Sequence, residues 1–175
     1  MYLRYPLKRC CITVSILGSL VNMSEPEESI SEDIQNKQLP WGKSFRMSFD
    51  AFNERYSLHD SIWISILKSN EVELSSVLAF CWDPVWLPKP VQNQLSNRTL
   101  APYLFIRLKT ASEIEYKGLK KEDLPNREIS KLEHTEIEDK SLLVIEDIFG
   151  GIVYITFEGE PEFLALDQDW KNLSL

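Results

Sequence analysis

The chain has 175 residues, of which 43% are hydrophobic and 26% are charged, and its formal net charge is −8. A chain of this size can bury enough surface to fold as one domain without disulfides or metals, so two domains are not expected. Cys10, Cys11 and Cys81 show no Cys-x-x-Cys spacing, which excludes a disulfide framework and a structural zinc site. This cysteine usage favours a reducing compartment, and we expect a cytoplasmic protein.

Residues 1–22 differ from the rest because three basic residues precede or flank an apolar run and no acidic residue occurs among them. Three interpretations stay open: sequence upstream of a true start at Met23, a signal-like export or anchor segment, and an ordered N-terminal element. The run is too short to span a bilayer. Residues 23–40 are polar and acidic and predict a mobile tail, so the folded α+β domain is expected over residues 41–175.

Without residues 1–22 the chain keeps 16 basic and 27 acidic residues, a net charge of −11. Such an acidic balance disfavours nucleic acid and anionic lipid as partners, because both carry negative charge. A basic protein is the partner that this charge favours. A membrane partner is expected only if residues 1–22 are a genuine export or anchor segment.

The first predicted element of the domain is a short helix beginning after Ser48. Ser48 can cap the helix and Asp50 lies in its first turn, while Phe49, Phe52 and Tyr56 share one face. Strand patterns follow, separated by a proline-containing loop at 82–101 and by a charged connection at 118–140 with a short helix. The predicted strands are 62–67, 72–80, 103–109, 112–116, 142–148, 152–157 and 162–166.

Short strands joined by turns, with one early helix and no alternation of strands and helices, indicate the fold class. We expect an α+β domain whose main part is an antiparallel meander of about six or seven strands, with the helix packed on the sheet. A half-open β-barrel fits the same pattern and stays open as an alternative.

The triplet His59-Asp60-Ser61 contains the residue types of a hydrolase triad. Adjacent residues of an extended segment point to opposite faces, so the three cannot form a relay among themselves. The structural interpretation is favoured: Asp60 or Ser61 satisfies backbone groups where the helix leads into the first strand, and His59 packs on an aromatic ring.

Two further clusters are candidates for a metal site or an acid–base pair. His134 lies among several acidic residues of the charged connection, but a metal site needs several convergent ligands, and solvated side chains are the expected outcome. Glu113 and Glu115 share a strand face without an apolar neighbour that would raise one pKa. Neither a glycine-rich phosphate loop nor a nucleophile motif occurs in the sequence, so we expect no cofactor, no metal and no catalytic residue.

The segment 82–90 carries two tryptophans on a loop stiffened by Pro84, Pro88 and Pro90. Exposed, Trp82 and Trp86 would be anchors for a protein partner, with Asp83 between them. Folded back, they would form a lid that completes the core. Both interpretations stay open, and the lid is the favoured one.

Five short features of the chain stand out together: the step at residues 58–61, the strand 62–64, the second strand ending at 82–83, and the turns at 150–151 and 157–159. In these features the chain resembles small bacterial immunity-like proteins of polymorphic toxin systems. Several of these β-rich proteins carry a His-Asp-Ser or His-Asp-Ala step before their first long strand. The likeness covers residues 45–167. It implies a non-catalytic role in which the domain occludes a toxin.

Three functional hypotheses follow. The first is a cytosolic, acidic, immunity-like binding domain that caps a basic partner with Trp82, Asp83 and Trp86, together with His59 and Asp60. The second is a hydrolase or metal-dependent enzyme centred on His59 and Asp60. The third is an accessory domain that serves assembly.

Overall fold

The structure is a computed structural model that describes residues 39–68, 75–95, 100–111 and 113–175. The expectations for residues 1–22 and for the tail up to residue 38 lie outside these ranges. The described strands are β1 (Phe45–Arg46), β2 (Ile62–Lys68), β3 (Ser75–Cys81), β4 (Tyr103–Lys109), β5 (Glu113–Lys117), β6 (Arg127–Ile137), β7 (Lys140–Asp147), β8 (Ile152–Phe157), β9 (Glu162–Leu166) and β10 (Asn172–Leu173). The helices are α2 (Phe49–Asn53) and α3 (Lys89–Gln92), with three-residue 3₁₀ turns η1 (Trp41–Lys43), η2 (Pro84–Trp86) and η3 (Lys121–Asp123).

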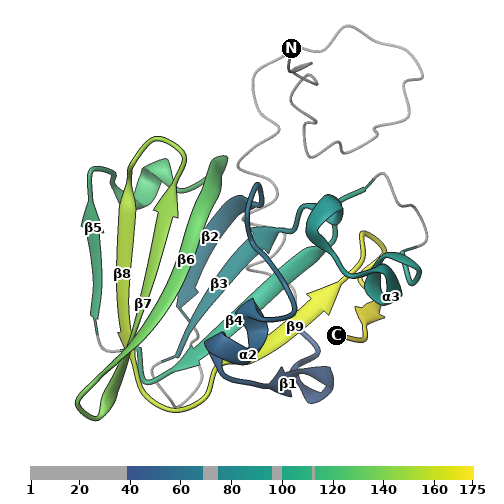
Figure 1. The fold of residues 1–175 in the computed structure, drawn as a ribbon, viewed down its shortest axis with the longest axis horizontal. Helices are drawn as coiled ribbons and strands as arrows, with labels where there is room; N and C mark the ends of the chain where they lie inside the picture. Colours follow the sequence, from purple (N-terminus) through teal and green to yellow (C-terminus); the bar gives the residue numbers. More distant parts are fainter. Residues whose placement is uncertain (1–38, 69–74, 96–99, 112) are drawn as a thin grey trace, which may run out of the picture.

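All strand pairs given by the register are antiparallel, and the strands form one sheet in the order β1-β9-β4-β3-β2-β6-β7-β8-β5, with β10 beside β9 (Figure 1). The sheet is not closed into a barrel. The prediction of a mainly antiparallel sheet with few short helices is confirmed. The predicted number of strands is wrong, because the described residues form ten strands rather than six or seven.

The sheet consists of two meanders joined at one end. Strands β2, β3 and β4 follow one another in space as in sequence, and so do β6, β7 and β8. Among the strands of the described ranges, the pairing that joins the two sets is that of β2 with β6, at Ile62 with Glu128 and at Trp63 with Arg127. Away from this contact the two halves diverge, and the core lies between them (Figure 1).

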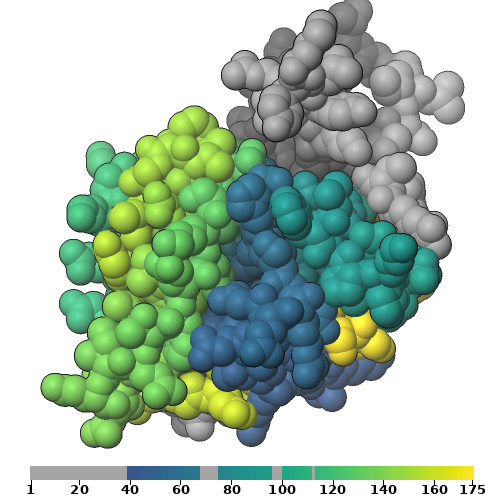
Figure 2. Space-filling model, in the orientation of Figure 1, coloured from purple at the N-terminus to yellow at the C-terminus, as the bar shows by residue number. Residues whose placement is uncertain are grey.

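Helix α2 fills the space between the diverging halves. The Ser48 hydroxyl accepts a hydrogen bond from the Ala51 amide at 3.2 Å, which confirms the predicted cap. Phe49 reaches the rings of Phe157 on β8 and Phe163 on β9 at centroid distances of 5.8 and 5.6 Å. The helix therefore holds together two strands from opposite ends of the sheet, and Figure 2 shows its blue segment seated between the green and the yellow strands.

The prediction that residues 118–140 form a connection is wrong for about half of that range. The short helix is present as η3, but Arg127–Ile137 form β6, which pairs with β7 along almost its whole length. Its charged residues alternate with half-buried ones, so the strand is held by backbone pairing and one-sided packing rather than by an apolar run.

The opposite part of the sheet contains a buried carboxylate. Glu162 on β9 is almost fully buried and accepts hydrogen bonds from the guanidinium groups of Arg107 on β4 and Arg46 on β1, with Lys109 Nζ 3.8 Å away. Burial alone would raise the pKa of Glu162, but the bonds from Arg107 and Arg46 outweigh it and hold that pKa below its usual 4.5. The ion cluster thus fastens the edge strand β1 to the sheet.

No helix in the described ranges is long and apolar enough to cross a membrane.

Candidate functional site

The candidate site lies at the end of the sheet where its two halves are joined. The end of β3, the start of β2, the start of β6 and the turn between β7 and β8 all reach this end, at the top of Figure 1. Residues 57–61 and η2 project from it. We call this surface the joined end.

The chain reaches β2 through a turn built around Asp60. Its φ of 61° lies in the left-handed region, where Asp is one of the few side chains that is tolerated. The Asp60 amide donates to the Ile129 carbonyl at 3.0 Å, and the Ile129 amide donates to the Ser61 carbonyl at 2.8 Å. These bonds fix the turn to β6, so the position of the Asp60 carboxylate is set by backbone contacts.

His59, Asp60 and Trp86 form one contiguous cluster. His59 Nδ1 lies 2.7 Å from Asp60 Oδ1, and the Trp86 indole N–H donates to Asp60 Oδ2 at 3.0 Å. The rings of His59 and Trp86 are 5.3 Å apart and tilted by 60°. The sequence placed these residues in separate segments, and the fold brings them together.

The two tryptophans of the loop have different surroundings. Trp82 is fully buried, packs against Phe52 and Tyr56, and donates its indole N–H to the Ser57 carbonyl at 2.7 Å. Trp86 is 44% exposed and Val85 is 72% exposed. In this structure Trp82 therefore has no surface to offer a partner, whereas Trp86 does.

The loop that carries Trp86 is held at several points. The Asp83 carboxylate accepts from the Val85 amide at 2.7 Å and begins η2, while the Asp83 amide donates to the Ser61 hydroxyl at 3.1 Å. Gln92 donates its side-chain amide to the Pro84 and Leu87 carbonyls at 3.0 and 2.7 Å. Fixing the loop in advance lowers the entropy that is lost when it binds something.

Glu128 is a member of the site that the sequence interpretation missed, because it lay in the predicted connection. It pairs with Ile62 at the start of β2, which places it beside the Asp60 turn. Burial raises the pKa of Glu128, the charges of Asp60 and Asp83 raise it further, and His59 opposes them in part. Asp60, Asp83 and Glu128 thus form an acidic group at the joined end, in which His59 contacts Asp60.

The geometry gives little support to a nucleophilic enzyme. Ser61 is fully buried and its hydroxyl accepts the Asp83 amide, so it is not presented beside His59. No group of three or more His, Cys, Asp or Glu side chains in the described ranges is arranged to hold a metal ion. What the cluster offers is an exposed indole beside carboxylates.

The other sequence candidates lie away from this end. His134 packs against the rings of Phe49 and Phe157, and its Nδ1 lies 3.5 Å from the exposed Asp50. Glu113 and Glu115 are exposed on β5.

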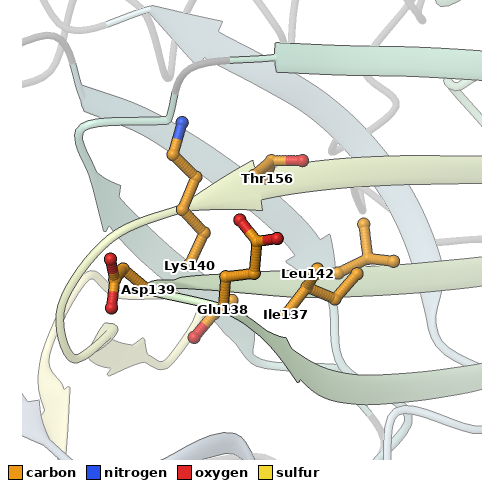
Figure 3. Close-up of a pocket in the computed structure, with 7 residues that line it drawn as sticks. Ile137, Glu138, Asp139, Lys140, Leu142 and Thr156 are labelled. Carbon is orange, nitrogen blue, oxygen red and sulfur yellow. The ribbon is translucent and has the colours of Figure 1, made fainter.

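A hollow of about 350 Å³ lies beside the turn between β6 and β7 and is lined by residues 137–142 and Thr156. Figure 3 shows its charged side chains pointing in different directions rather than converging on one point.

No family model, no curated protein and no solved structure matches this chain.

Proposed function

We propose that this chain is a non-catalytic protein-binding domain that contacts its partner through the joined end, with Trp86 as the anchor. The observation that supports this most strongly is the state of Trp86: its indole is half exposed, hydrogen-bonded to Asp60, and carried on a loop fixed by the core. Tryptophans held in this way are enriched among the residues that dominate binding energies at interfaces.

The carboxylates suggest the chemistry of the partner. Asp60, Asp83 and Glu128 lie close enough to influence one another, and the chain as a whole carries a net charge of −8. A basic protein would be attracted over distance and would neutralise this cluster on contact. With the resemblance to immunity-like proteins, this supports occlusion of a basic, toxin-like protein in the cytoplasm.

The experiment is affinity purification of the tagged full chain from its native host at low and at moderate salt, with bound proteins identified by mass spectrometry. We compare the wild type, Trp86→Ala and, as a matched control, Ile137→Ala, which removes an exposed side chain at the opposite end of the sheet. The proposal predicts one stoichiometric basic protein with the wild type and the control, less with Trp86→Ala, and less as salt rises. Equal recovery by Trp86→Ala would contradict it.

A second candidate is a hydrolytic enzyme that uses the hydrogen-bonded pair of His59 and Asp60. This pair is half exposed, as a general base needs to be. If a hydrolytic activity is found, His59→Ala should abolish it while leaving the folded structure intact. An activity that survives His59→Ala would rule out this role.

A further inference from the structure

The turn between β7 and β8 presents a second apolar surface at the joined end. Phe149 is 72% exposed and Ile148 is 47% exposed. Five large hydrophobic side chains are exposed in the described ranges, and four of them belong to this end: these two, Val85 and Trp86. Exposed apolar residues gathered in this way, with polar groups around them, are typical of interaction surfaces.

The Phe149 turn is built as rigidly as the Trp86 loop. Asp147 is buried, and its Oδ1 accepts hydrogen bonds from the amides of Phe149 and Gly151, both at 2.8 Å. Gly150 adopts a φ of 82°, and a Cβ at Gly151 would lie 2.7 Å from Asp147 Oδ2. The Arg127 guanidinium lies 5.1 Å from the centre of the Phe149 ring. The backbone that carries the exposed ring is therefore fixed before any partner arrives.

The strand order gives the spacing between the two strands that lead to these apolar surfaces. Trp86 follows β3 and Phe149 follows β7, and these strands are separated by β2 and β6. Three strand spacings amount to about 14 Å. The Ile148 amide donates to the Glu128 carbonyl at 3.0 Å, so the turn is tied to the residue that lies between the two surfaces.

The space between the two apolar surfaces is acidic. Asp60 lies two residues before β2, and Glu128 on β6 pairs with Ile62, the first residue of β2, so the two acidic residues are neighbours. Arg127, the nearest cation on β6, is already engaged, with its Nη1 3.3 Å from Asp147 Oδ2. A cationic side chain supplied from outside would be the natural counterpart of the Asp60 and Glu128 pair.

We propose that the Phe149 turn is the second anchor of the same surface, and that the joined end recognises a basic segment in which one Lys or Arg side chain is flanked by two apolar side chains about 14 Å apart. This inference rests on the proposed binding function and adds the class of segment that is bound. Along an extended peptide, residues i, i+2 and i+4 share one face and span about 13 Å, which matches this spacing.

The test uses the full chain labelled with ¹⁵N and two blocked peptides, Leu-Ser-Arg-Ser-Phe and its matched control Leu-Ser-Glu-Ser-Phe. Titration followed by NMR reports on the Trp86 indole N–H and the Phe149 amide separately. We expect both signals to shift along one binding curve with the arginine peptide, and an affinity at least about tenfold lower for the glutamate peptide. Trp86→Ala and Phe149→Ala should each weaken binding of the arginine peptide about 5- to 30-fold, whereas Ile137→Ala should leave it unchanged.

The outcomes separate this inference from the proposed function. Shifts at Trp86 alone, with Phe149→Ala binding as well as the wild type, would overturn the second anchor and leave Trp86 as the anchor. Equal shifts with both peptides, or shifts with neither, would overturn the proposed segment class. If Trp86→Ala also recovers the native partner as well as the wild type does, the proposed function itself is wrong. Because Phe149 is 72% exposed, Phe149→Ala should fold as the wild type does, and the ¹⁵N spectrum of the variant checks this directly.

Discussion

Replacing each loop tryptophan by alanine should separate the structural residue from the binding residue. A buried tryptophan removes roughly 200 Å² from water, which at about 25 cal/mol per Å² corresponds to about 5 kcal/mol. Trp82 is fully buried and loses a hydrogen bond as well, so Trp82→Ala should lower the free energy of unfolding by about 4–5 kcal/mol. Trp86 is 44% exposed, so the same arithmetic gives a cost of only about 2–3 kcal/mol for its replacement.

The assay is urea denaturation at neutral pH, followed by far-ultraviolet circular dichroism. Both variants should keep the slope of the wild type, and the midpoint of Trp82→Ala should fall much further than that of Trp86→Ala. Since small domains have only about 5–15 kcal/mol of stability, Trp82→Ala should remove a large fraction of it. Equal losses for the two variants would refute the assignment of Trp82 to the core and Trp86 to the surface.

Three further predictions concern stability. Glu162→Gln should lower the free energy of unfolding at pH 7 by about 3 kcal/mol, because it removes the buried negative charge that accepts hydrogen bonds from Arg107 and Arg46. The folded pKa of Glu162 is depressed, so this stabilisation is present above about pH 4.5 and is lost as the pH falls through the folded pKa, where melting curves of variant and wild type should converge. Glu128→Gln should raise the melting temperature at pH 7, because the folded pKa of Glu128 is raised and its ionised form therefore destabilises the fold. The gain should vanish below about pH 4.5, and a lower melting temperature of the variant at pH 7 would contradict this prediction. Gly151→Ala should cost about 1–3 kcal/mol in urea, because the new Cβ overlaps the buried carboxylate of its turn, whereas Gly42→Ala, which meets nothing within 4 Å, should be neutral.

Local sequence patterns correctly predicted the strands that contain a short apolar run and the helix that begins with a capping residue. The strands at 103–109, 152–157 and 162–166 and the cap at Ser48 are found as expected, because each depends on residues close in sequence. Strand β6 was missed because only one of its faces is covered and that face mixes Leu132 with the polar Ser130 and His134, so no continuous apolar pattern marks it. The order of the strands was also beyond local patterns, since β9 pairs with β4 and β2 with β6 through long-range contacts.

The candidate site was predicted in its parts but not in its arrangement. His59, Asp60 and Trp86 were singled out by residue type, yet nothing in the spacing of residues 59 and 86 indicates that the indole donates to Asp60. The assignment of Trp82 to the core and Trp86 to the surface depends on the direction of the chain after β3. Glu128 and Phe149 were missed because both enter the site from the second half of the sheet. For Phe149 a signal existed: two large apolar residues directly before Gly150-Gly151 place hydrophobic side chains in a turn.

The most direct test of a binding role for the joined end is site-specific photo-crosslinking in the native host. A photoreactive amino acid replaces Val85, which is 72% exposed and neighbours Trp86, and in a second strain it replaces Ile137 at the opposite end of the sheet. If the joined end binds the partner, we expect one discrete adduct with a basic protein from position 85 and no such adduct from position 137. An adduct with the same protein from position 137 and none from position 85 would contradict it.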